Sequence, residues 1–377
     1  LTMSAVHPAV DPDGLLEYSV VFTDRSLNHM SQAFQSVMRG LHEGLTDVYQ
    51  APHCVLVPGG GTFAMEAVAR QFARDETVLV IRNGWFSYRW SQIFAQGVAP
   101  AHAEIATAVP DHAEPDQQFQ PVDVETVCAQ IAHVQPKLVI APHVETSAGM
   151  LLPDGYLKRV ADAAHAVGAL FVLDCVAAGA LWVDMNALGV DVLITAPQKG
   201  WTSTPCAGVV MMSDRARARL LDTQSDSFAL DLKKWQQIMQ AYLDGGHAYH
   251  GTLPTDGLLQ YFQTYQEMAA VGFAELKERQ INLGQSIRQL IESYGYKSLA
   301  AAPFQAPTVV VSHTTRDDVK NGSAFAAQGI QIAAGVPLEC GESAAFKTFR
   351  IGLFGLDKLM HPERTVEHLK QGFDALG

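Results

Sequence analysis

The chain has 377 residues, of which 48% are hydrophobic and 17% are charged, and this composition is typical of a well-packed globular protein. The length exceeds what one hydrophobic core usually fills, so we expect one large domain and a smaller one. The formal net charge of −13 argues against nucleic acid or an anionic membrane as a partner, because both attract basic surfaces. A small molecule is the better expectation for a ligand.

The cysteines and the N-terminal residues predict a cytoplasmic protein. The five cysteines are scattered, with neither paired metal spacing nor a disulfide framework, which is typical of reduced thiols in the cytosol. Single histidines such as His102, His165 and His313 show no ligand spacing, so we expect no metal site. The first residues lack the pattern of a signal peptide, and no stretch reaches the roughly 18 apolar residues that a membrane span needs.

Six short apolar runs alternate with helical patterns in the first part of the chain. They cover residues 53–57, 77–81, 137–141, 170–173, 190–194 and 208–212. Runs without polar alternation are typical of strands that are buried on both faces. Between the third and fourth runs, apolar residues recur at helical spacing from Tyr156 to Val167, and Gly168 follows as a C-cap. The alternation predicts an α/β fold with a mostly parallel sheet covered by helices.

The pattern changes after Pro254. One long helical stretch runs from Leu258 to about Tyr294, and short mixed elements lead to a final helix near residues 365–376. We therefore expect a second, α+β domain in this part of the chain. The expected division is a large domain over residues 15–256 and a small domain over residues 257–377, with residues 1–14 packed against the small one.

Ligands of open α/β sheets bind beyond the carboxyl ends of the strands, so the residues that follow each run are informative. The first run ends in the stretch 58–62, Pro-Gly-Gly-Gly-Thr, which opens a helix. Glycines let a phosphate approach the backbone, and the start of a helix offers free N–H groups, although a plain tight turn is the simpler alternative. The stretch lacks a Walker lysine, and no acid follows the next strand to bind a ribose, so both nucleotide interpretations weaken.

Other chemically important residues follow the later runs. Four aromatic residues lie within 85–90, where one could stack on a planar ring although such residues are usually core. A dense polar set covers 143–149, for which a satisfied buried network is the alternative. Asp174 ends the fourth run, where a carboxylate is costly unless it is paired, and Lys199 follows the fifth. Both should lie at one edge of the sheet.

Together these features match pyridoxal phosphate. Lys199 would form the Schiff base with this cofactor, and Asp174 would hold the pyridine nitrogen protonated. Each feature alone is weak, since an isolated lysine is more often a surface residue. The ordered set of an acid, a lysine, an aromatic platform and a phosphate-binding helix start is specific.

The chain resembles the class V, fold type I aminotransferases, in the branch of alanine–glyoxylate and serine–pyruvate aminotransferases, over nearly its whole length. The stretches that carry the resemblance are 60–67, 83–86, 143–149, 173–176, 198–199, 249–254 and 349–352. The resemblance implies a pyridoxal phosphate-dependent transferase fold with a seven-stranded, mostly parallel sheet. It also implies a homodimer with shared active sites.

The resemblance assigns roles to individual positions. Lys199 and Asp174 would be catalytic, and Arg350 would bind the substrate carboxylate, a task suited to a planar bidentate donor. The implied cofactor-binding residues are Gly60, Gly61 and Thr62 with Gln198 at the phosphate, Phe86 and Val176 on the two ring faces, Thr146 near the ring hydroxyl, Asp174, Lys199, and Tyr249 and Thr252 reaching the neighbouring subunit.

The implied reaction is a ping-pong transamination. It moves the amino group of a small amino acid of the alanine or serine type to a small 2-oxo acid of the glyoxylate or pyruvate type. The chain departs from its relatives at Pro197, at Trp201 and in the N-terminal segment 11–26, and we expect these positions near the substrate. The alternative is a cysteine desulfurase or related lyase that uses Cys340, although Glu339 and Glu342 would raise the pKa of that thiol.

Overall fold

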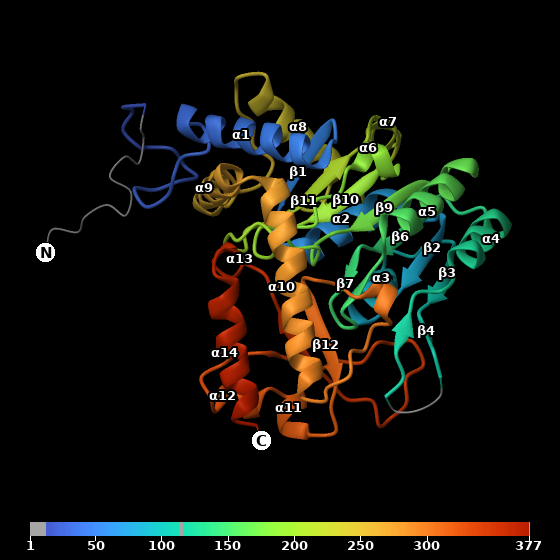
Figure 1. The fold of residues 1–377 in the computed structure, drawn as a ribbon. Coiled ribbons are helices and arrows are strands. Elements are labelled where there is room, and N and C mark those ends of the chain that lie inside the picture. The colour runs from blue at the N-terminus through green and yellow to red at the C-terminus, as the bar shows by residue number, and fades with distance from the viewer. Residues whose placement is uncertain (1–12, 113–115, 377) are drawn as a thin grey trace, which may run out of the picture.

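The computed structural model describes residues 13–112 and 116–376, and its centre is a seven-stranded sheet (Figure 1). The strand order is β1-β11-β10-β9-β6-β2-β3. The bounds are β1 His53–Pro58, β2 Thr77–Arg82, β3 His102–Thr107, β6 Leu138–Pro142, β9 Leu170–Asp174, β10 Val192–Thr195 and β11 Ala207–Met212. β11 pairs antiparallel with β1 and β10, and the remaining pairs are parallel. The predicted α/β fold with a mostly parallel sheet is confirmed.

The sequence pattern located six of these strands and missed β3. β3 lies at the edge of the sheet and pairs only with β2 among the described strands. Its sequence, His-Ala-Glu-Ile-Ala-Thr, alternates polar with apolar residues, and only Ala106 in it is buried. β1, the strand at the other edge, has four buried residues in a row, whereas β3 is only partly covered and therefore lacks the continuous apolar run that identifies the other six strands.

Helices cover the sheet on both faces. They are α1 Gln32–Tyr49, α2 Gly61–Phe72, α3 Trp85–Ala95, α4 Val124–Val134, α5 Asp154–Ala166, α6 Met185–Leu188, α7 Asp214–Asp222 and α8 Leu232–Leu243. In α5 the buried side chains recur at helical spacing, including Leu157, Val160 and Ala164, which explains why the segment folds as an amphipathic helix. Gly168 follows its end with a φ of +78°, a backbone conformation that favours glycine.

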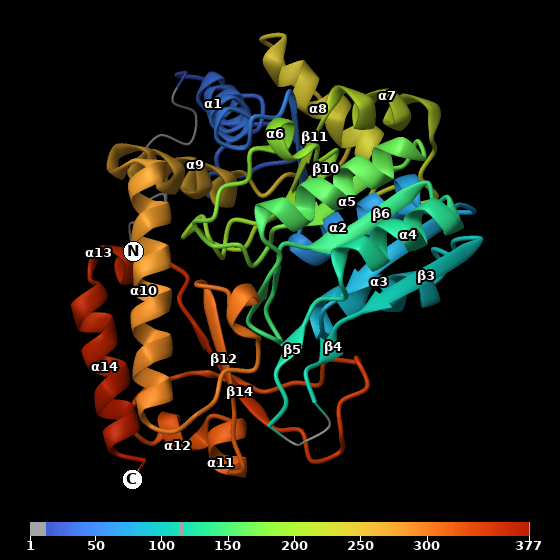
Figure 2. The ribbon, with the colours of Figure 1, turned by 45° about the vertical axis from the view of Figure 1, so that its right-hand side comes forward.

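A second, smaller sheet has the strand order β12-β14-β13. Its strands are β12 Val309–His313, β13 Ala333–Ala334 and β14 Thr348–Gly352, and its helices are α10 Phe273–Ser293, α11 Asp317–Lys320, α12 Ser323–Ala326, α13 Leu356–Met360 and α14 Pro362–Asp374. Figures 1 and 2 show α10 and α14 side by side along this sheet, and the two helices pack against each other. Within the part of the chain that is described, no helix has the length and apolar character to cross a membrane.

The long helix that the sequence predicts from Leu258 to about Tyr294 is two helices. α9, Thr255–Val271, ends at Gly272, whose φ of +101° breaks the helical path before α10 begins. α9 packs against α1, whereas α10 packs against α13 and α14. The predicted domain division at residues 256 and 257 stays a prediction, and we propose Gly272 as its more natural position. The predicted packing of residues 1–14 against the small domain stays a prediction, since residues 1–12 lie outside the described part of the chain.

Smaller elements complete the fold. The two-stranded pairs are β4 Val109–Pro110 with β5 Phe119–Gln120, and β7 Val144–Glu145 with β8 Met150–Leu151, and a 3-10 turn covers Ala302–Phe304. Isolated bridges join Phe119 to Ala300 and Met150 to Gln305. These bridges connect segments beyond the carboxyl edge of the large sheet to the chain that leads into β12.

Trp201 is a core residue, whereas the sequence predicts a place near the substrate for it. Its side chain is fully buried and lies among five aromatic rings. The rings are Trp182 at 4.7 Å, Tyr261 and Phe273 at 5.9 Å, Tyr49 at 6.0 Å and Tyr265 at 6.1 Å between centroids. The indole N–H donates to the Tyr49 hydroxyl at 3.3 Å. The loop after Lys199 is therefore fixed by packing against α1 and α9.

Truncation of Trp201 should destabilise the protein strongly. We expect Trp201→Ala to lower the free energy of unfolding by about 3–5 kcal/mol, because it removes a fully buried indole and leaves a cavity. Trp201→Phe keeps an aromatic ring and should cost less. Chemical denaturation followed by circular dichroism measures both changes, and equal losses for the two variants would contradict the packing role.

Candidate active site

The register of the large sheet brings the predicted acid and lysine to one edge. β10 pairs in parallel with β9, with Ile194 opposite Asp174. The chain therefore leaves β10 where β9 ends, and the turn that follows carries Lys199. β1, which runs in the same direction as β10, delivers the glycine stretch to this edge as well.

A cavity of about 170 Å³ lies at this edge of the sheet. Its lining residues are Gly61, Thr62, Met65, Phe86, Arg89, Val144, Thr146, Asp174, Val176, Ala177, Gln198 and Lys199. The structure thus brings together eight of the residues that the sequence singles out. Gly60 lies beside them as the N-cap of α2, and the Arg350 guanidinium lies 5.5 Å from the centroid of the Phe86 ring. Tyr249 and Thr252 do not line the cavity, and their hydroxyl groups lie 3.2 Å apart.

One corner of the cavity is suited to an anion. The first residue of α2 is Gly61, and its N-cap Gly60 provides no side chain to occupy the free N–H groups of the first turn. A Cβ added at Gly61 would lie 2.7 Å from Val176 Cγ2, so a larger residue would fill this space. The Nε2 of Gln198, the amide atom that donates hydrogen bonds, would lie 3.9 Å from a Cβ added at Gly60, so a donor lies beside the N-cap of α2. These features fit a phosphate group at the start of α2.

Asp174 forms the buried acidic end of the cavity. Burial raises the pKa of its carboxyl group to about 6, and a hydrogen bond of 2.9 Å from the Val176 N–H opposes the shift. The described ion pairs do not include this carboxylate. Attraction to the Arg89 guanidinium also opposes the shift. A protonated ring nitrogen would supply a direct positive partner, because an ionised buried carboxylate is costly until it is paired.

Lys199 faces the same cavity with an amine that loses its proton readily. Burial and the nearby Arg350 and Arg89 guanidinium groups lower the pKa of Lys199 below its usual range. The ammonium nitrogen lies 5.0 Å from the centroid of the Phe354 ring. A neutral amine is the form that attacks an aldehyde or accepts a proton, so these surroundings suit covalent and base chemistry.

Glu145 supports the wall of the cavity from behind. It is fully buried, and its two oxygens accept hydrogen bonds from the N–H and hydroxyl groups of Ser87 and Ser147 and from the Phe86 N–H, at 2.7–3.1 Å. A Cβ added at Gly84 would lie 2.1 Å from Ser147 Oγ, so this close packing requires glycine. Three of these five donors belong to Phe86 and Ser87 in the first turn of α3, and they hold this turn and the Phe86 ring in place. The alternative interpretation of residues 143–149 as a satisfied buried network is therefore correct for Glu145.

Sequence patterns assign no role to Arg89 or Phe354, both of which lie close to Lys199. Arg89 follows Phe86 by one helical turn on α3, and this spacing is a signal that places the two on one helix face. Phe354 lies just beyond β14, which carries Arg350, and no pattern in the sequence marks its contact with Lys199. The buried Pro197 accepts a hydrogen bond from the Ser203 N–H through its carbonyl, and nothing in the structure explains why proline stands there.

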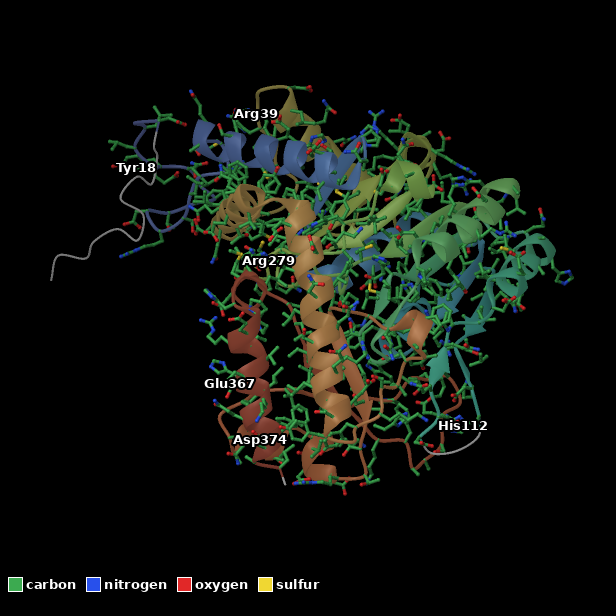
Figure 3. The ribbon with its side chains drawn as sticks, viewed as in Figure 1. Tyr18, Arg39, His112, Arg279, Glu367 and Asp374 are labelled. Atoms are coloured by element: carbon green, nitrogen blue, oxygen red, sulfur yellow. The ribbon has the colours of Figure 1, made fainter. Side chains whose placement is uncertain are left out.

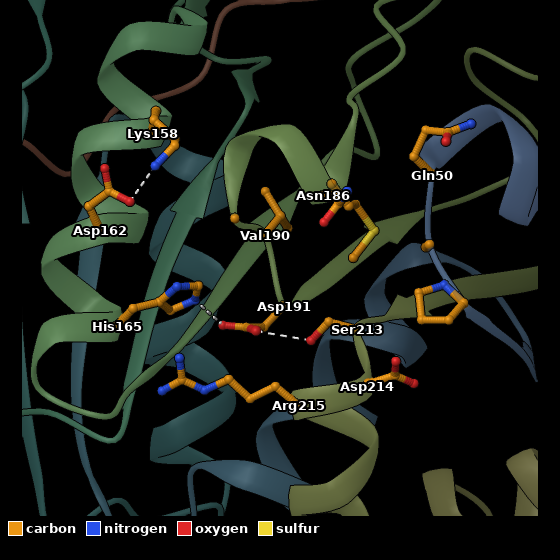
Figure 4. Close-up of a pocket in the computed structure, with 14 residues that line it drawn as sticks. Gln50, Lys158, Asp162, His165, Asn186, Val190, Asp191, Ser213, Asp214 and Arg215 are labelled. Carbon is orange, nitrogen blue, oxygen red and sulfur yellow. Dashed lines mark hydrogen bonds and ion pairs between the residues drawn. The ribbon is translucent and has the colours of Figure 1, made fainter.

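A larger hollow of about 710 Å³ lies at the opposite edge of the sheet (Figure 4). Figure 4 shows Asp191 between His165 and Ser213, to which it is joined by hydrogen bonds of 2.8 and 2.9 Å. Asp191 also accepts from the Phe171 N–H at 2.9 Å. Because the carboxylate holds α5, β9 and the start of α7 together, its role is structural.

The fold and this site together define a pyridoxal phosphate enzyme of fold type I. A family model described as aminotransferase class V matches residues 15–354. The chain belongs to the class V aminotransferase family, and it is a pyridoxal phosphate-dependent aminotransferase.

Similar proteins include two curated transaminases. The 2-aminoethylphosphonate–pyruvate transaminase of Paraburkholderia phymatum is 27% identical over 337 residues, covering 88% of this chain and 84% of that protein. The alanine–glyoxylate aminotransferase of Oryctolagus cuniculus is 26% identical over 343 residues, covering 87% and 82%. The crystal structure of an alanine–glyoxylate aminotransferase from Nostoc sp. has a TM-score of 0.77 at 22% identity and covers 92% of this chain and 89% of that one, which shows the shared fold.

The buried carboxyl group of Asp174 should leave a pH signature in the cofactor-free protein. Its pKa rises from 3.8 to about 6, so its neutral form stabilises the fold below pH 3.8, and this contribution is lost as the pH rises through 6. Asp174→Asn removes the titration. We expect the unfolding free energy of the variant to rise relative to that of the wild type by about 2 kcal/mol between pH 4 and pH 7, because a small part of the total effect is already present at pH 4. Chemical denaturation at both pH values measures the gain, and a difference independent of pH would contradict it.

Proposed function

We propose that this aminotransferase moves the amino group of a small amino acid, of the alanine or serine type, to a small 2-oxo acid such as glyoxylate or pyruvate. The observation that carries the proposal is the meeting of Lys199, Asp174 and the anion-binding start of α2 in one cavity. The relatives support the substrate class, because those described above are a 2-aminoethylphosphonate–pyruvate transaminase and an alanine–glyoxylate aminotransferase.

In the proposed reaction, each side chain has a separate task. Pyridoxal phosphate supplies an electron sink when it is bound. The desolvated Lys199 amine would anchor the cofactor and then carry the α proton of the amino acid. Asp174 would hold a proton on the ring nitrogen through its negative charge. Phe86 and Val176 would hold the ring between them, and Gly60, Gly61, Thr62 and Gln198 would bind the phosphate.

Arg350 would hold the substrate carboxylate. Its Nε donates to the Ala334 carbonyl at 2.8 Å, and this bond fixes the side chain. The two Nη atoms stay available for an end-on bidentate pair with a carboxylate. Burial lowers the pKa of Arg350, and the Glu145 carboxylate opposes this shift. A half-buried guanidinium 5.5 Å from the centroid of the Phe86 ring is a suitable site for an anionic group of the substrate.

The functional unit is proposed to be a homodimer in which Tyr249 and Thr252 reach the phosphate site of the neighbouring subunit. The Tyr249 side chain is 56% exposed, so it is available to a partner. The segment before α1 also exposes large apolar side chains, with Leu16 at 82% and Tyr18 at 87%. Figure 3 shows Tyr18 at the outer margin of the molecule. Apolar groups gathered in this way are typical of a surface that a second subunit covers.

A cytoplasmic location is also part of the proposal. All five cysteines are free in the structure, which is the usual state of thiols in a reducing compartment.

The alternative desulfurase chemistry has little support. Burial raises the pKa of the Cys340 thiol to about 12, and Glu342 adds to the shift, whereas such an enzyme needs a reactive thiolate. The thiol lies 3.5 Å from the Arg82 carbonyl and 3.6 Å from that of Leu338. The relatives named above are transaminases.

Borohydride reduction tests the role of Lys199. After incubation with pyridoxal phosphate and reduction, peptide mass spectrometry should find the cofactor on Lys199, because reduction makes the covalent link permanent. Lys199→Ala should show no adduct and no absorbance change with alanine, serine, aspartate or 2-aminoethylphosphonate. Lys158→Ala, which removes a lysine at the opposite edge of the sheet, is the control and should behave as wild type. An adduct on another lysine would overturn the assignment.

Replacement of Cys340 separates the two chemistries. Cys340→Ser should keep transamination with glyoxylate or pyruvate at the wild-type rate within about twofold, because the thiol touches none of the cavity-lining residues in its described hydrogen bonds. Sulfide release from cysteine that disappears in this variant would instead favour the desulfurase.

A further inference from the structure

Arg89 is a cavity residue with no assigned task. It lies on α3, and its Nη1 donates to the Thr62 hydroxyl oxygen at 2.9 Å. Its guanidinium carbon lies 5.3 Å from the centroid of the Phe86 ring. A hydroxyl group of α2 and an aromatic ring of its own helix therefore fix its position. A side chain held in this way loses little further freedom when it binds a ligand.

The positive charge of the Arg89 guanidinium favours an anion beside it. Among the described residues, no carboxylate forms an ion pair with this half-buried guanidinium. Arg70 on the neighbouring α2 offers a contrast, because it pairs with Glu66 at 2.7 Å and with Asp226 at 2.9 Å. The cavity lining holds the Arg89 guanidinium, the Lys199 amine and one acid, Asp174. An anionic group of a ligand would give Arg89 a partner of opposite charge.

The position of Arg89 favours the phosphate corner over the substrate side. Its partner Thr62 belongs to the first turn of α2, where N–H groups that no side chain caps are available to an anion. The Thr62 hydroxyl accepts a hydrogen bond from Arg89, which leaves its own proton free to be donated to a further acceptor. Arg350 is anchored elsewhere, on β14 and against the Ala334 carbonyl. The two arginines thus approach the Phe86 ring from different elements.

We propose that Arg89 binds the phosphate group of the cofactor, directly and through the orientation of the Thr62 hydroxyl. One face of α3 would then supply both the ring platform, Phe86, and the cation for the phosphate, one helical turn apart. The Glu145 network fixes the start of this helix, so it would fix both groups together. This inference rests on the proposed cofactor site.

A comparison of pyridoxal phosphate with pyridoxal, which lacks the phosphate, tests the inference. The cofactor-free wild type, Arg89→Met and the control Arg215→Met are titrated with each compound, and quenching of tryptophan fluorescence gives the dissociation constant. Arg215 is exposed at the opposite edge of the sheet, so its replacement removes the same charge far from the site. Arg89→Met should weaken binding of pyridoxal phosphate about 10- to 100-fold, and binding of pyridoxal by less than about twofold. Arg215→Met should change neither.

Other results would overturn the inference in distinct ways. Unchanged binding of pyridoxal phosphate to Arg89→Met would show that Arg89 does not contact the phosphate. An equal loss for both compounds would show a general effect on the cavity. A wild type that binds neither compound would remove the proposed function itself. If circular dichroism shows that Arg89→Met does not fold, Arg89→Gln, which keeps a donor for Thr62 without the charge, should give the same selective loss.

Discussion

The parallel pairing of β9 with β10 is the constraint on which the site depends. It makes two segments that are distant in sequence end at the same edge of the sheet, with Asp174 on one and the Lys199 turn on the other. Because both strands are completely buried, a shift of register by one residue would turn their apolar side chains away from the packing that holds them. The packing of these two strands in the hydrophobic core therefore determines how far apart the acid and the lysine lie.

Much of the fold and part of the site could be predicted from the sequence, and the limits have physical causes. Buried strands leave continuous apolar runs, so six strands were found, whereas the half-exposed edge strand β3 left none. The break at Gly272 could not be predicted, because a glycine can also lie inside a helix, and its φ of +101° is seen only in the folded backbone. Local patterns identified Lys199 and Asp174 by their place after strands. They could not show that Trp201 points into an aromatic cluster, or that Arg89 contacts Thr62, because both facts arise from tertiary packing.

Glu145 shows how a buried polar group can determine the shape of a binding site that it does not line. Its carboxylate gathers five hydrogen bonds from two segments, the first turn of α3 and the β7–β8 turn. Satisfied networks of this kind are rigid, because loss of one partner leaves an unpaired donor or acceptor in a low-dielectric interior. The aromatic wall of the cavity is consequently in place before any ligand arrives, and the ordering cost of binding falls.

The segment after Lys199 is attached to two parts of the molecule at consecutive residues. Trp201 is embedded among the rings of α1 and α9, and the Thr202 hydroxyl accepts a hydrogen bond of 2.5 Å from the Leu356 N–H at the start of α13. Thr202 also has a φ of +63°, which a β-branched residue adopts only when its surroundings hold it there. The lysine thus stands next to a segment that contacts α1 and α9 through Trp201 and α13 through Thr202. Gly200, between the lysine and this segment, has no side chain and so leaves room for the Gly179 backbone. A movement of the C-terminal helices would therefore reach the reactive amine through the Thr202–Leu356 hydrogen bond.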